Sequence, residues 1–148
     1  MKKEDVYARM MHTPDDPARA ELRAALRETW KQLMPMHRGL IDAAKEEYAA
    51  AVGPIGGPNH LLQLLQENEF FAWLRPMTSL IVDIDSLSRT DFERADVDAI
   101  AERLGRFFGN APDADFSARY LPILQREIDV AAGHAALRKL LQRLRPVV

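Results

Sequence analysis

Cysteine is missing from this chain of 148 residues, which excludes disulfides, thiolate nucleophiles and zinc sites built on cysteine. No apolar run approaches the ~20 residues that a membrane-spanning helix requires. The first sixteen residues, MKKEDVYARMMHTPDD, also lack the apolar core of a secretory signal peptide. We therefore expect a cytoplasmic protein with no membrane span.

A large excess of charge of either sign is also missing. The formal net charge is −2 and the isoelectric point is about 6.1, so the whole molecule is not built to bind polyanions. Hydrophobic residues make up 47% and charged residues 28%, which is typical of a folded globular protein. The length predicts one domain over residues 1–148, with residues 1–14 as a mobile N-terminal tail.

Residues that favour strands are scarce. The chain has 21 Ala and 18 Leu, against 7 Val, 7 Ile and 4 Thr, and Ala and Leu lose little rotamer freedom in a helix. Proline and glycine gather in a few clusters, of which GPIGGPN is the densest. A chain of short strands would show turn signals more often. These patterns predict an all-α fold.

The first helix is predicted over residues 17–52. Asp16 followed by Pro17 is a helix-start signal, and Gly53 followed by Pro54 is a stop signal. The apolar stripe keeps its phase across Pro35, which favours one helix kinked on its solvent side over a break into two helices.

A short helix is predicted at 60–67, followed by a central helix at 70–88. Within the latter, SLIVDID is an alternative candidate for a buried strand. A lone strand would leave its backbone groups unpaired, and no second strand candidate exists. A further helix begins near Thr90 or Asp96 and ends at Gly109.

The last predicted helix begins at Asp113 or Asp115 and changes its apolar face after Gly133. A straight helix cannot turn both faces to one core, so we expect either a bend near Gly133 or a second apolar face toward a partner. The whole predicts a single-domain bundle of four main helices in antiparallel up-and-down order, the first Pro-kinked, with a short additional helix.

No metal-binding or phosphate-binding motif is present. Glu-x-x-His and His-x-x-x-His, the spacings of di-iron and zinc-protease sites, do not occur. Methionine adjoins histidine at Met10–His12 and Met34–His37, where core packing is a simpler explanation than Cu(I) binding. We therefore expect no metal and no cofactor.

Candidate catalytic residues are few. His37 lies on the apolar stripe of the first helix, where a buried, hydrogen-bonded imidazole is the simpler interpretation. As a general base it would need an acid such as Asp83 or Asp85 nearby, and both lie at the boundary of their helix face. A pocket near His37, Trp73, Asp83 and Asp85 would suit a small enzyme or ligand-binding protein.

Two apolar surfaces remain without a partner in the predicted bundle. Phe71 and Val82 form a second face on the helix at 70–88, and four leucines form the reversed stripe near the C-terminus. A symmetric dimer would cover both surfaces. The residues predicted at an interface are Phe71, Val82, Leu137, Leu140, Leu141 and Leu144.

The basic C-terminal segment suggests a third possibility. Residues 134–148 carry four Lys or Arg residues and no acid, a pattern that would suit binding to nucleic acid or to an anionic membrane. Four charges are few for nucleic acid, so a structural role or an acidic protein partner is the favoured interpretation. The functional prediction is a non-enzymatic interaction or regulatory protein that forms a homodimer, with the small enzyme or ligand-binding protein as the alternative.

Overall fold

The computed structural model describes residues 15–146, and this range contains helices and turns but no strand. The six α-helices and one 3-10 helix are α2 (Pro17–Ala51), α3 (Pro58–Glu67), η1 (Glu69–Leu74), α4 (Arg75–Ser88), α5 (Arg94–Phe108), α6 (Ala114–Arg126) and α7 (Ile128–Leu144). The tail predicted at 1–14 lies outside the described residues.

Helix α2 confirms the prediction of one long first helix. The carboxylate of Asp16 accepts a hydrogen bond from the Arg19 amide at 2.7 Å, which caps the first turn. The helix is continuous across Pro35, whose side is exposed, and ends at Ala51. Gly53, with a φ of 155°, then takes a conformation that disfavours other residues. A kink at Pro35 stays a prediction.

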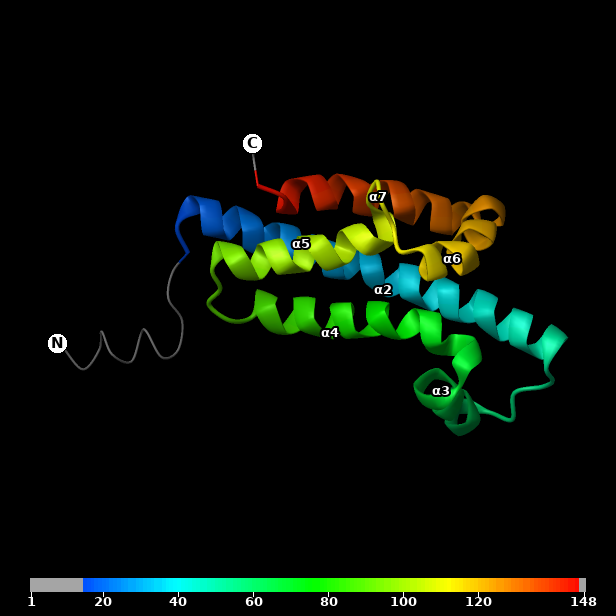
Figure 1. Cartoon of the computed structure of the whole chain (residues 1–148). Helices are drawn as coiled ribbons and strands as arrows, with labels where there is room; N and C mark the ends of the chain where they lie inside the picture. Colours follow the sequence, from blue (N-terminus) through cyan, green and yellow to red (C-terminus); the bar gives the residue numbers. More distant parts are fainter. Residues whose placement is uncertain (1–14, 147–148) are drawn as a thin grey trace, which may run out of the picture.

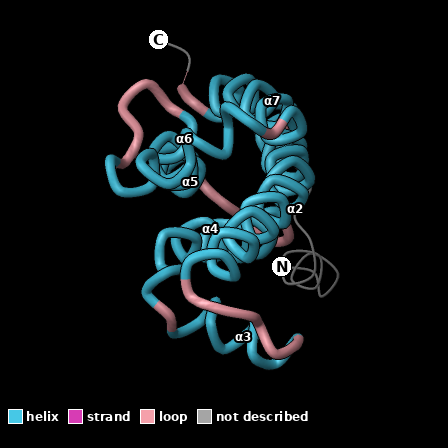
Figure 2. Tube along the Cα trace, turned by 90° about the vertical axis from the view of Figure 1, so that its right-hand side faces the viewer, coloured by secondary structure: helices cyan, strands magenta, loops and turns pink. Residues whose placement is uncertain are grey.

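Helices α2, α4, α5 and α7 alternate in direction along the helical bundle (Figure 1). Helix α2 packs against α4 and α7, and α5 packs against the same two helices. Seen after a turn of 90°, α2 and α7 lie side by side with α5 across from them (Figure 2). The predicted all-α bundle is therefore confirmed.

The segment predicted as one helix over 70–88 divides into η1 and α4. Pro76, which has no amide hydrogen to donate, stands in the first turn of α4, where none is needed. The segment forms no strand, so the alternative of a buried strand at SLIVDID is wrong. The central helix is α2 instead, since it contacts η1, α4, α6 and α7.

The predicted bend near Gly133 is wrong. The chain breaks at Glu127, whose extended backbone separates α6 from α7, and α7 runs through Gly133 without interruption. A Cβ atom on Gly133 would lie 3.1 Å from the Met36 Cε atom, so this glycine lets α7 approach α2 closely. The break at Glu127 allows α6 and α7 to turn different faces to one core.

Because the helix break comes earlier than predicted, the reversed apolar stripe of α7 faces the hydrophobic core. Leu137, Leu140, Leu141 and Leu144 are all buried in the cluster that forms the core. The large apolar side chain that is exposed on α7 is Ile128, the first residue of the helix, which keeps 85% of its surface accessible. The four leucines therefore need no second subunit to cover them.

Candidate functional site

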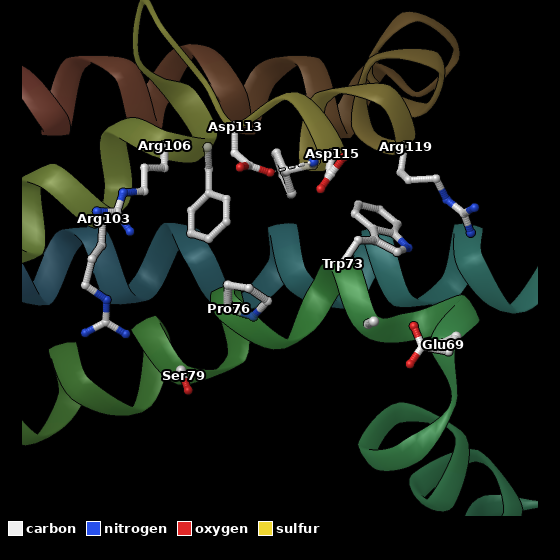
Figure 3. Close-up of a pocket in the computed structure, with 12 residues that line it drawn as sticks. Glu69, Trp73, Pro76, Ser79, Arg103, Arg106, Asp113, Asp115 and Arg119 are labelled. Carbon is white, nitrogen blue, oxygen red and sulfur yellow. Dashed lines mark hydrogen bonds between the residues drawn. The ribbon is translucent and has the colours of Figure 1, made fainter.

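A hollow of about 540 Å³ lies between the η1–α4 segment and the α5–α6 segment (Figure 3). We call it the aromatic hollow. Its volume lies in the range typical of small-molecule sites. It is lined by Glu69, Ala72, Trp73, Pro76, Ser79, Arg103, Arg106, Phe107, Asp113, Asp115, Phe116 and Arg119.

Three aromatic side chains from three elements form the apolar part of this hollow. Trp73 comes from η1, Phe107 from the last turn of α5, and Phe116 from the first turn of α6. The Phe116 ring centroid lies 5.7 Å from that of Trp73 and 4.8 Å from that of Phe107. Phe116 and Phe107 are buried, so the packing of the core fixes their positions.

Local capping positions Phe116. The carboxylate of Asp113 accepts a hydrogen bond from the Phe116 amide at 2.9 Å and begins α6. A short turn from Gly109 links the end of α5 to this cap. Two aromatic residues that lie nine positions apart in the chain therefore meet at the hollow.

Three arginines contribute positive charge, and each has a partner in the structure. Arg103 donates from Nη1 to Asp83 at 2.7 Å. Arg106 donates from Nη2 to Glu102 at 3.2 Å. The Arg119 guanidinium carbon lies 4.6 Å from the Phe70 ring centroid and its Nη2 donates to the Phe70 carbonyl. Neither Asp83 nor Glu102 lines the hollow.

Two of the three acids in the hollow have no side-chain partner. Glu69 and Asp115 form neither a salt bridge nor a side-chain hydrogen bond within residues 15–146. The third acid, Asp113, is engaged in the helix cap. Arg119, which has no acidic partner in the described residues, stands at the same end, so a ligand would meet two carboxylates and one guanidinium near η1 and α6.

Trp73 adds an unsatisfied donor. Its indole Nε1 atom is buried and has no hydrogen-bond partner in the described part of the chain. A buried donor without a partner costs about 1–3 kcal/mol. One hydrogen-bond donor in the wall of the aromatic hollow, the Trp73 indole N–H, therefore has no acceptor among the described residues.

A second hollow, of about 470 Å³, lies where α2, α3 and α4 meet, and we call it the histidine hollow. His37 Nε2 lies 2.7 Å from Thr78 Oγ1, and Thr78 also donates to the Leu74 carbonyl at 3.2 Å. Burial lowers the pKa of His37. The neutral imidazole is therefore favoured at neutral pH.

The structure separates most of the predicted site residues. His37 and Asp83 both line the histidine hollow, whereas Trp73 lines the aromatic hollow. Asp83 is paired with Arg103, and Asp85 with Arg89 at 3.2 Å. No hydrogen bond joins His37 to either aspartate within residues 15–146.

The predicted interface residues also divide into two groups. Phe71 is fully buried and packs against both Tyr48 and Phe70, and the four C-terminal leucines are core residues. Their side chains are covered within one chain, so the apolar surface that suggested an interface does not exist there. Val82 alone is exposed, at 61% of its surface, and it lines the histidine hollow.

Part of the basic C-terminal charge has structural partners. Arg138 donates to the Phe108 carbonyl and to Asn110, and Arg143 donates to Glu21 on α2. His134 accepts or donates a hydrogen bond with the buried Tyr120 hydroxyl at 2.8 Å. These contacts use basic side chains to join α7 to the rest of the bundle.

The arginines and acids of the aromatic hollow were missed at the level of sequence. Arg103 and Arg106 stand one turn apart on α5, beside the buried stripe that ends at Phe107. That spacing predicts two basic side chains beside an aromatic residue, and it is the sequence pattern from which this part of the hollow could have been predicted. Glu69 and Asp115 carry no comparable signal, because they lie far apart in the sequence and meet at the hollow only through the packing of η1 and the first turn of α6.

No protein-family model, curated protein or solved structure matches the chain. Within residues 15–146, no three His, Cys, Asp or Glu side chains gather as metal ligands would. None of the described helices is long and apolar enough to cross a membrane.

Proposed function

We propose that the protein binds a small organic molecule in the aromatic hollow and acts as a binding protein rather than an enzyme. One observation carries this proposal: three aromatic side chains and six charged side chains surround one hollow of about 540 Å³. Sites for small molecules combine such apolar walls with a few polar groups that orient the ligand.

The same residues give little support to catalysis. No histidine lines the aromatic hollow within the described range. The best general-base candidate, His37, lies in the other hollow and is hydrogen-bonded to Thr78. The proposal therefore follows the ligand-binding half of the alternative drawn from sequence, with the site moved from His37 to Trp73.

A screen of small aromatic fragments by protein NMR tests the proposal. We expect fragments to shift the indole resonance of Trp73 and to lose binding in an Ala72→Phe variant, which fills the hollow. The matched control is Gln66→Phe, which adds the same ring to the histidine hollow. Fragments that bind equally to both variants, or a screen without any binding, would contradict the proposal.

A second candidate function is self-association through the histidine hollow. Val82 and Leu62 keep 61% and 54% of their surface accessible there and make it the more apolar of the two hollows. A second copy of the chain would cover both side chains and complete the homodimer predicted from sequence.

Sedimentation at high micromolar concentration tests this candidate. We expect a dimer that the Val82→Arg variant converts to monomer, since a buried unpaired charge is costly. The control is Ile128→Arg, at an exposed residue on another helix. A monomeric protein at that concentration would contradict self-association.

A further inference from the structure

The charges of the aromatic hollow are distributed unevenly: two of its three arginines lie at one end, and two of its three acids lie at the other with the third arginine, Arg119. Figure 3 shows Arg103 and Arg106 together at the α5 end, while Glu69 and Trp73 lie toward the η1 end and Asp115 stands above Trp73. The lining contains three arginines and three acids, with an excess of one positive group at the α5 end when Asp113 is counted there and of one negative group at the η1 end when Arg119 is counted there.

At the α5 end, arginine donors remain for a ligand. A guanidinium has five N–H donors, and hydrogen bonds to Asp83 and Glu102 use one each on Arg103 and Arg106. The Arg106 and Glu102 side chains are 63% and 72% exposed, and such surface pairs contribute little to stability. A ligand carboxylate or phosphate can therefore compete with Glu102 for Arg106.

At the other end, a positive group has free partners. Glu69 and Asp115 have no side-chain partner, and the rings of Trp73 and Phe116 stand beside them. An ammonium group is attracted both to carboxylates and to the faces of aromatic rings. Arg119 also lines this end, but its guanidinium lies over the Phe70 ring and donates to the Phe70 carbonyl, and among the described residues it forms no salt bridge with Glu69 or Asp115. Two carboxylates therefore stand against one guanidinium here, so the excess charge at this end is negative.

We infer that the ligand of the aromatic hollow is a small zwitterion with an apolar or aromatic body. Its anionic group lies at Arg103 and Arg106, and its cationic group lies at Glu69 and Asp115. This inference rests on the proposed function, since it names the chemical class of the molecule bound there. A ligand with one charge would satisfy only one end of the hollow.

Four derivatives of phenylalanine test the two ends separately. They are the free amino acid, its N-acetyl form without the cation, its amide without the anion, and the doubly blocked neutral form. The Trp30→Phe variant leaves Trp73 as the only tryptophan of the chain, so its fluorescence reports binding directly. We expect the free amino acid to bind at least 5-fold more tightly than either singly blocked form.

Variants then assign each end to its residues. Arg106→Gln should weaken the free amino acid and the N-acetyl form, and leave the amide unchanged. Asp115→Asn should weaken the free amino acid and the amide, and leave the N-acetyl form unchanged. Glu102→Gln removes a competitor from Arg106 and should tighten the two forms that carry a carboxylate.

The outcomes separate this inference from the proposed function. If fragments bind the hollow but a singly charged or neutral phenylalanine binds as tightly as the zwitterion, the ligand class is overturned and the binding function stands. The same holds if fragments bind and none of the four derivatives does. If neither fragments nor derivatives bind, the proposed function itself is overturned.

Discussion

His37 illustrates how burial decides the state of a single residue. Its imidazole is half-buried in the histidine hollow and hydrogen-bonded to Thr78, and burial lowers its pKa. Burial and the charge of Arg138 lower the pKa of His134 as well. The sequence placed His37 on the apolar stripe but could not supply Thr78, which lies 41 positions further along the chain.

This depressed pKa predicts a pH dependence of stability. Below pH ~6.5 the unfolded chain binds a proton at His37 that the folded chain resists, so the folded state is progressively destabilised as pH falls from the unfolded pKa toward the lower folded one. Urea unfolding at pH 7.5 and 5.5 should show lower stability at pH 5.5, with a smaller loss in His37→Gln. An NMR titration in which His37 protonates at or above pH 6.5 would contradict the prediction.

Arg23 shows the difference between a largely buried and an exposed arginine. It binds both oxygens of Asp15 at 2.7 and 3.1 Å and donates to the carbonyls of Ser88 and Thr90, so it joins the start of α2 to the α4–α5 turn. Its guanidinium also lies 4.9 Å from the Phe92 ring centroid. The hydrogen bond to Asp15 helps to raise the pKa of Arg23.

Substitution of Arg23 should therefore be costly. Arg23→Gln breaks charge-assisted hydrogen bonds in a nearly buried site and should lower the free energy of unfolding by about 1.5–3 kcal/mol. Arg89→Gln removes only an exposed pair with Asp85 and should change it by less than about 1 kcal/mol. Chemical denaturation measures both, and equal losses would contradict the assigned role of Arg23.

At the scale of elements, the strongest sequence signals were local ones. Asp16, Pro17 and Gly53 marked the ends of α2, and Gly109 marked the end of α5, because these residues act on the backbone next to them. The break at Glu127 had no such signal. No glycine or proline stands at Glu127. The break occurs at this residue because it allows α6 and α7 to turn different apolar faces to one core.

The burial of the reversed leucine stripe on α7 gives a prediction for stability. Leu137→Ala leaves a cavity in the core and should cost about 2–5 kcal/mol of unfolding free energy. Ile128→Ala, at a residue with 85% of its surface exposed, should change stability by less than about 0.5 kcal/mol. Thermal or urea unfolding distinguishes the two. A near-neutral Leu137→Ala would mean that the leucine stripe faces outward.

For the whole molecule, composition and periodicity were enough to predict an all-α bundle, because helix propensity and one apolar face per helix determine that class. They did not place the aromatic hollow. That site needs Trp73 from η1, Arg106 from α5 and Asp115 from α6, and contacts between elements bring these residues together. The predicted pocket combined His37 with Trp73, which the structure assigns to separate hollows.

The salt bridge between Arg143 and Glu21 shows that the first and last helices are neighbours, so the chain can be connected in a different order without changing the packing. It joins the last helix to the first at 2.9 Å, and both described ends of the chain lie at the same end of the bundle (Figure 1). A circularly permuted chain, opened between Gly53 and Gly57 and closed by a flexible linker from residue 146 to residue 15, would keep every helix and its neighbours. We expect the permuted chain, whose new termini lie between α2 and α3, to form the same helical bundle.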